Sequence, residues 1–159
     1  MHRADREVKD ISKTIEFLNE EKVCRIGLYD GEKVYVVPMN YGFEHNEGRK
    51  LTFYLHCAQI GRRIDIVKKN PEVCIEIDGR HMLETADIPC DYGYFYMSLI
   101  GNGRLKFVDD IKEKEDILCK FMLQQTGKEI NNFGEKWLNA VCIMKLELTD
   151  YTVKEHKKQ

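Results

Sequence analysis

The stretch LTFYLHCAQIGRRIDIVKKNPEVCIEI, residues 51–77, places a strand, a turn, a short helix and a second strand in direct succession. Residues 51–56 alternate between two faces, which predicts a strand that ends at His56 on its less apolar face. Residues 60–70 carry apolar side chains at helical spacing and are followed by a proline, which prevents the helix from continuing. Residues 73–77 alternate again. Two strands joined by a helix that starts with a glycine and two arginines therefore form the centre of the predicted fold.

Spacing arguments extend this pattern in both directions along the chain. They predict further strands at 23–29, 34–39, 93–108 and 141–153, and helices at 3–21 and 111–125. Turn-forming residues predict a hairpin at Asp30-Gly31, irregular segments at 44–49 and 79–92, and a frayed polar tail at 154–159. Because most strands follow one another directly, antiparallel pairing is expected. The predicted class is α+β, mainly β: a six-stranded antiparallel barrel, closed or partly closed, with peripheral helices.

Length and charge limit the classes of function. With 159 residues, the chain is expected to form a single domain over 1–159. Its 25 basic and 27 acidic side chains give a net charge of −2, which argues against a general nucleic-acid binder. No apolar run approaches about 18 residues, so no membrane-spanning helix is expected. Residues 1–10 lack the apolar core of a signal peptide, and we expect a cytoplasmic protein.

The six cysteines show no short spacing typical of a zinc site or a redox dithiol. We interpret them as reduced thiols that act as small hydrophobic side chains. The sequence also contains no P-loop and no nucleophile elbow. This lack of acid–base or nucleophile machinery favours a protein in which a bound cofactor does the chemistry.

Three segments are candidates for binding. Arg62 and Arg63 follow Gly61 at a predicted helix start, where free backbone N–H groups and two cations favour a phosphate or carboxylate; the alternative is an exposed basic pair. Residues 34–43 contain a proline that implies a strand edge or end, with free backbone groups, or simply the arm of a hairpin. Residues 94–105 contain two glycines, which suit either the close approach of a planar ligand or a bulge in a barrel strand.

On these segments the chain resembles a known family, the flavin-binding split-barrel proteins related to pyridoxamine 5′-phosphate oxidase. It is most similar to their 5-nitroimidazole-resistance-like branch. The resemblance covers nearly the whole chain and is carried by MHRADREV (1–8), VVPMNYGF (36–43), the opening stretch (51–77), SLIGNGRLKFVDD (98–110) and WLNAVCIMKLELTDYTVKEH (137–156).

The resemblance implies a six-stranded split barrel, an FMN cofactor, and a homodimer with two flavin sites at its interface. By position, it implies that Arg62 and Arg63 hold the FMN phosphate, with His56 and Ala58 beside it. It implies that the isoalloxazine ring is lined by Pro38, Met39, Asn40 and Tyr41, some of them through backbone atoms. It further implies that Ser98, Ile100 and Gly101 lie near the flavin and that Trp137 reaches toward the partner's site.

The chain departs from the family pattern at a few positions. Arg63 stands where the branch usually has lysine, Cys57 where serine is common, and Val153 where the closing strand often has glycine. None of these changes removes the two cations expected to bind the phosphate. The pyridoxamine phosphate oxidases use an arginine and a histidine late in the chain for the substrate phosphate, whereas the last arginine here is Arg104 and His156 lies in the polar tail. The vitamin B6 reaction itself is therefore not expected.

The hypothesis is an FMN-dependent oxidoreductase that acts on a small-molecule electron acceptor, with nitro compounds among the candidates. Two alternatives remain open at the level of sequence. One is a non-catalytic flavin carrier or redox sensor. The other is a haem-binding or haem-degrading protein, in which His56 would be the first ligand to test.

Overall fold

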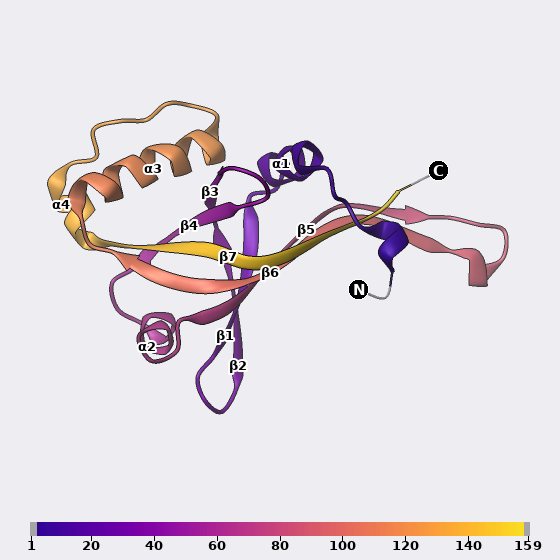
Figure 1. Ribbon diagram of the computed structural model, residues 1–159, viewed down its shortest axis with the longest axis horizontal. Helices are drawn as coiled ribbons and strands as arrows, with labels where there is room; N and C mark the ends of the chain where they lie inside the picture. The colour runs from indigo at the N-terminus through magenta and orange to yellow at the C-terminus, as the bar shows by residue number, and fades with distance from the viewer. Residues whose placement is uncertain (1–2, 158–159) are drawn as a thin grey trace.

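The computed structural model describes residues 3–157, apart from the side chain of Thr149. Its strands are β1 (Val23–Tyr29), β2 (Val34–Asn40), β3 (Gly42–His45), β4 (Leu51–Ala58), β5 (Glu72–Glu84), β6 (Gly93–Val108) and β7 (Val141–His156). Its helices are α1 (Ile11–Glu20), α2 (Arg62–Lys69), α3 (Ile111–Thr126) and α4 (Glu135–Ala140), with 3₁₀ turns at Ala4–Arg6 and Pro89–Asp91. Figure 1 shows α2 and α3 on opposite sides of the strands.

The strands form one antiparallel sheet in the order β2-β1-β5-β6-β7-β4-β3. The two edge strands, β2 and β3, are separated in the chain by Tyr41 alone. Because consecutive Cα atoms lie about 3.8 Å apart, the two edges must come together, and the sheet curls into a barrel. The mainly β, antiparallel architecture with peripheral helices agrees with the sequence-based prediction.

The number of strands differs from the predicted six. The described residues form seven strands because Gly42–His45 pairs with Leu51–Tyr54 as a separate edge strand, where a loop was expected from residue 44. β3 lies under α3: a Cβ added to Gly42 would lie 2.9 Å from the Phe121 Cα atom. The absence of a side chain at Gly42 lets helix and strand approach closely, and local periodicity cannot report such a contact.

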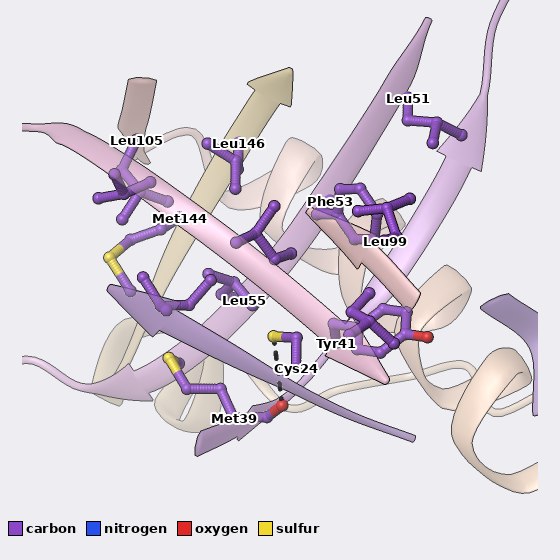
Figure 2. Close-up of a cluster of buried hydrophobic side chains, with 14 of the residues drawn as sticks. Cys24, Met39, Tyr41, Leu51, Phe53, Leu55, Leu99, Leu105, Met144 and Leu146 are labelled. Atoms are coloured by element: carbon purple, nitrogen blue, oxygen red, sulfur yellow. Dashed lines mark hydrogen bonds between the residues drawn. The ribbon is translucent and has the colours of Figure 1, made fainter. Parts of the chain in front are cut away.

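The core fills the inside of this barrel. Alternate residues of the strands are buried there, and Figure 2 shows Leu51, Phe53 and Leu55 of β4 facing Leu99, Leu105, Met144 and Leu146 of the neighbouring strands. The Cys24 thiol donates to the Met39 carbonyl oxygen over 3.4 Å within this core. The alternation of apolar and polar residues in the sequence therefore corresponds to side chains that point into and out of the barrel.

The N-terminal helix predicted over 3–21 is wrong in its first half. Val8 is buried, and its backbone N–H donates to the Val153 carbonyl oxygen over 2.9 Å, so this part of the chain lies extended beside β7. The helix begins only at Ile11, where the Asp10 carboxylate accepts from the Ser12 N–H over 2.9 Å as an N-cap. Pairing with a distant strand outweighs the local helical periodicity.

Residues 79–92 were predicted to be irregular, and the first six of them are not. β5 continues to Glu84 and β6 begins at Gly93, so the two strands form a long hairpin that projects beyond the sheet in Figure 1. The pairing shifts register between Gly79 and Met82, which interrupts the alternation that would have signalled a strand. The tail expected at 154–159 is also partly wrong, because β7 extends to His156, while residues 158–159 lie outside the described part.

Three local predictions are confirmed. The hairpin at Asp30-Gly31 joins β1 to β2, and Pro38 lies on the edge strand β2, where a missing backbone N–H is tolerated. The β6–β7 pairing shifts register between Asn102 and Gly103, as expected for a bulge in a long barrel strand. Within residues 3–157, no helix has the length and apolar character needed to cross a membrane.

Candidate functional site

The candidate site lies where β4 ends and α2 begins. The chain turns at Gly61, whose φ of 137° is a conformation that side-chain-bearing residues avoid. The helix that follows is eight residues long, and its first two residues are Arg62 and Arg63. A helix start presents backbone N–H groups without intrahelical partners, which attract anions.

Arg63 has a buried polar atom that is not satisfied. Its side chain is partly buried, and its Nε atom is buried with no hydrogen-bond partner. A buried donor without an acceptor costs about 1–3 kcal/mol, and more for a charged group. The guanidinium is therefore placed to bind an acceptor that the protein itself does not provide.

A cavity of about 410 Å³ opens beside Arg63. It is lined by His56, Cys57, Ala58, Arg63, Trp137, Ala140 and Val141. The structure thus brings together four of the residues predicted from the sequence, namely His56, Ala58, Arg63 and Trp137. The Trp137 side chain comes from α4 and is 72% exposed, so one wall of the cavity is an accessible aromatic surface.

His56 contributes hydrogen-bonding capacity without charge. Its ring packs edge-on against Phe121 of α3, with ring centroids 4.6 Å apart. Partial burial, and then the positive charge of Arg63, lower the pKa of His56 below its ordinary value. The imidazole is therefore neutral at pH 7, and the positive charge of this cavity comes from Arg63.

Arg62 is engaged elsewhere. Its Nη2 donates to the Asp30 carboxylate over 2.9 Å, and its guanidinium lies 4.5 Å from the centre of the Tyr35 ring. Backbone N–H donation from Lys33, followed by the Arg62 hydrogen bond, lowers the pKa of Asp30 to about 2. Arg62 is thus held against the β1–β2 hairpin and does not line the cavity.

The four residues from Pro38 to Tyr41 divide into exposed and buried pairs. Met39 and Tyr41 point into the core, and the Tyr41 hydroxyl donates to the Leu18 carbonyl oxygen over 2.9 Å. Pro38 and Asn40 are exposed, and Asn40 Nδ2 donates to the Lys22 carbonyl oxygen over 3.0 Å. A ligand on this segment can therefore contact the side chains of Pro38 and Asn40 but not those of Met39 and Tyr41.

Ser98, Ile100 and Gly101 lie on β6, between β5 and β7, and do not line the cavity beside Arg63. Ile100 is 48% exposed on the outer face of the sheet, whereas Gly101 is buried. One copy of the chain therefore does not bring these three residues together with His56 and Arg63.

Sequence reasoning missed the residues that hold the far wall of the cavity in place without lining it. Lys114 of α3 is buried, and its ammonium donates to the Leu138 and Val141 carbonyl oxygens over 3.3 and 3.2 Å. Gln59 donates from its side-chain amide to the Asn139 carbonyl oxygen. These bonds hold the end of α4 and the start of β7 in place. A lysine within a charged helix carries no local signal of such burial.

Residues 3–157 contain no group of three or more His, Cys, Asp or Glu side chains arranged to hold a metal ion. The site thus consists of one cation, one neutral imidazole, a thiol, an aromatic wall and a helix start. This set suits an anionic group attached to a larger ring system.

Several solved structures have a fold similar to that of this chain. A proposed 5-nitroimidazole antibiotic resistance protein from Bacteroides thetaiotaomicron is 27% identical, with a TM-score of 0.81 over 94% of this chain and 86% of the other. The flavocytochrome Anf3 from Azotobacter vinelandii is 16% identical, with a TM-score of 0.77 over 95% of this chain and 69% of the other. An FAD and haem binding protein from Mycobacterium smegmatis is 12% identical, with a TM-score of 0.79 over 96% and 74% of the two chains.

A search of curated proteins found no match. The family model for pyridoxamine 5′-phosphate oxidase matches residues 10–155, which is most of the chain. Together with the similarity to the Bacteroides protein, this match agrees with the resemblance found in the sequence. The chain therefore belongs to the pyridoxamine 5′-phosphate oxidase family, in the branch that resembles 5-nitroimidazole resistance proteins.

Proposed function

We propose that this protein binds FMN and acts as an oxidoreductase on a small-molecule electron acceptor. The observation that carries the proposal is the Arg63 Nε atom, which is buried beside a cavity and has no partner. A flavin phosphate is an acceptor that satisfies it through a charge-assisted hydrogen bond.

The residues present fit such a group. Arg63 and the backbone N–H groups at the start of α2 would hold the phosphate, and His56 offers a further hydrogen bond. Trp137 provides an exposed aromatic surface on the same cavity. When bound, FMN supplies hydride or electron transfer to an acceptor. The protein's own part is to anchor the phosphate, orient the ring and exclude water from it.

A homodimer with the flavin at its interface belongs to the same proposal. The outer face of the sheet exposes Val34, Val36 and Ile100, whose side chains are 72%, 56% and 48% accessible. Val34 and Val36 are neighbours on one face of β2, and adjacent exposed apolar side chains favour association with another surface, whereas Ile100 lies three strands away on β6. A second copy seated on this face would bring its Ser98, Ile100 and Gly101 toward the cavity, which one chain alone does not do. Sedimentation at micromolar concentration tests this, and a monomer contradicts it.

The similar structures widen the choice of ligand. The Azotobacter protein is described as a flavocytochrome and the Mycobacterium protein as binding FAD and haem. A second candidate ligand is therefore haem, and the observation that favours it is the neutral His56 imidazole, which is the form that ligates metals. Haem spectra that are identical for wild type and His56→Ala would argue against this residue as the ligand.

The first test is the visible spectrum of the purified protein, with the released cofactor identified by mass. A flavin spectrum with the mass of FMN supports the proposal, and the mass of FAD corrects it. Protein that is colourless and takes up no added FMN overturns it. If flavin is bound but neither nicotinamide donors nor nitro compounds react, the protein is a flavin carrier or sensor and the oxidoreductase part fails.

A further inference from the structure

Two cysteines far apart in the sequence face each other across the sheet. Cys57 of β4 and Cys142 of β7 are direct partners in the antiparallel register. Opposite residues of such a pair have Cα atoms about 4.5–5.5 Å apart, and their side chains share one face of the sheet. Disulfides need Cα atoms about 4.4–6.8 Å apart. The register alone therefore places these thiols within bonding range.

The surroundings make the two thiols chemically unequal. The facing Cys142 thiol, and then the positive charge of Arg63, lower the pKa of Cys57 below its ordinary value. The interaction with Cys57, together with partial burial, raises the pKa of Cys142. Cys57 is thus the nucleophile, since the thiolate is the reactive form, and Cys142 retains its proton.

Both sulfur atoms lie beside open space. Cys57 lines the cavity next to Arg63, and Cys142 lines a second cavity of about 360 Å³ between α2 and α3. Each side chain is partly exposed. By contrast, Cys24 is fully buried in the barrel, and burial raises its pKa to about 12. A small oxidant can reach the facing pair but not Cys24.

We infer that Cys57 and Cys142 form a redox-active dithiol site that reduces hydroperoxides and closes into a cross-strand disulfide. In the first step the Cys57 thiolate attacks the terminal oxygen of the hydroperoxide. An S–O bond forms, the O–O bond breaks, and the leaving alkoxide or hydroxide takes a proton from water. Cys57 becomes a sulfenic acid, oxidised by two electrons.

In the second step Cys142 attacks the Cys57 sulfur. An S–S bond forms, the S–O bond breaks, and the departing hydroxide takes the proton that Cys142 releases, which gives water. Overall, two thiols and one hydroperoxide give one disulfide, one alcohol or water, and one further water. A dithiol reductant restores the thiols by exchange. The reaction uses no flavin, although Cys57 and Arg63 line the cavity that the proposed function assigns to the FMN phosphate.

The test uses the whole reduced protein and one equivalent of hydrogen peroxide at pH 7. Wild type should lose the two thiol hydrogens, and peptide mapping should link Cys57 to Cys142. Cys142→Ser should stop at the sulfenic acid, which dimedone traps on Cys57, whereas Cys57→Ser should form neither product. Cys119→Ser, a matched control on the outer helix α3, should still form the bond. Circular dichroism of each variant establishes that it is folded.

A second measurement examines the part played by Arg63. Arg63→Gln should slow the first step several-fold at pH 7, and the difference should shrink as the pH rises and thiolate forms without help. The inference is overturned if the folded wild type forms no Cys57–Cys142 bond, or if dimedone labels Cys57 no faster than Cys74. It is also overturned if Cys57→Ser consumes peroxide at the wild-type rate.

Discussion

Arg62 and Arg63 are adjacent and carry the same charge. Replacing each of them separately shows which one contributes to cofactor binding. In Arg63→Ala the unpartnered Nε donor is removed from the cavity, whereas in Arg62→Ala an exposed ion pair with Asp30 is removed from the hairpin. Both residues lie in the first turn of α2, so helix propensity and net charge change equally. Any difference in cofactor affinity then reports the position of each side chain.

The expected magnitude follows from the kind of bond that is lost. A hydrogen bond to a charged group contributes about 1.5–3 kcal/mol, so Arg63→Ala should raise the dissociation constant for FMN roughly 10- to 150-fold. An exposed ion pair contributes about 0–1 kcal/mol, so Arg62→Ala should change this constant less than about sixfold. Arg63→Lys retains the charge but not the fork of donors and should lie between the two.

Titration of apoprotein with FMN, followed by quenching of flavin fluorescence, measures all three variants and wild type. Thermal unfolding without FMN serves as the control for folding. Equal affinity of Arg63→Ala and wild type would refute the assignment of Arg63 to the phosphate. A larger loss in Arg62→Ala than in Arg63→Ala would show that Arg62 leaves Asp30 when the ligand binds, and would reverse the assignment.

Three other predictions concern stability and reactivity. Gly103→Ala should destabilise the fold by about 1–3 kcal/mol in urea, since its Cβ would overlap the Glu147 carbonyl oxygen, and an unchanged midpoint would contradict this packing. The pKa of His56 is lowered in the folded state, so the unfolded state binds a proton at His56 more strongly. The stability that the neutral imidazole allows is therefore complete above about pH 6.5 and is lost as the pH falls below that value. Urea midpoints at pH 7.5 and 5.5 should therefore differ more for wild type than for His56→Gln, and equal differences would exclude this residue as the cause. Cys24 should resist iodoacetamide in native protein and react only after unfolding, because burial raises its pKa to about 12; mass mapping checks this, and native labelling would refute it.

The barrel was largely predictable because its signals are local. The alternation in β1, β2, β4, β6 and β7 follows from one face packing on the core, and a period of two is visible in a few residues. The errors in the predicted secondary structure occur where pairing with another strand decides the conformation. Val8 is extended because it pairs with Val153, and the β5–β6 hairpin is longer than expected because its register shifts after Gly79.

The candidate site was predictable only in its centre. His56, Ala58 and Arg63 lie in one short stretch, so a strand end and a helix start place them together. Trp137 was predicted as a site residue from the family resemblance alone. Lys114, which holds the far wall, was missed because a buried lysine in a charged helix looks like any exposed one.

By itself, the sequence determined most of the strands, the glycine turn at residue 61 and the two arginines that follow it, since these depend on neighbours in the chain. Only the tertiary structure decided which arginine is available, because adjacent residues on a helix point in different directions and Arg62 meets Asp30 and Tyr35 of a distant hairpin. The tertiary structure likewise brought Cys57 opposite Cys142 through the β4–β7 register. Strand pairing joins segments that are remote in the chain, and no spacing within one segment encodes it.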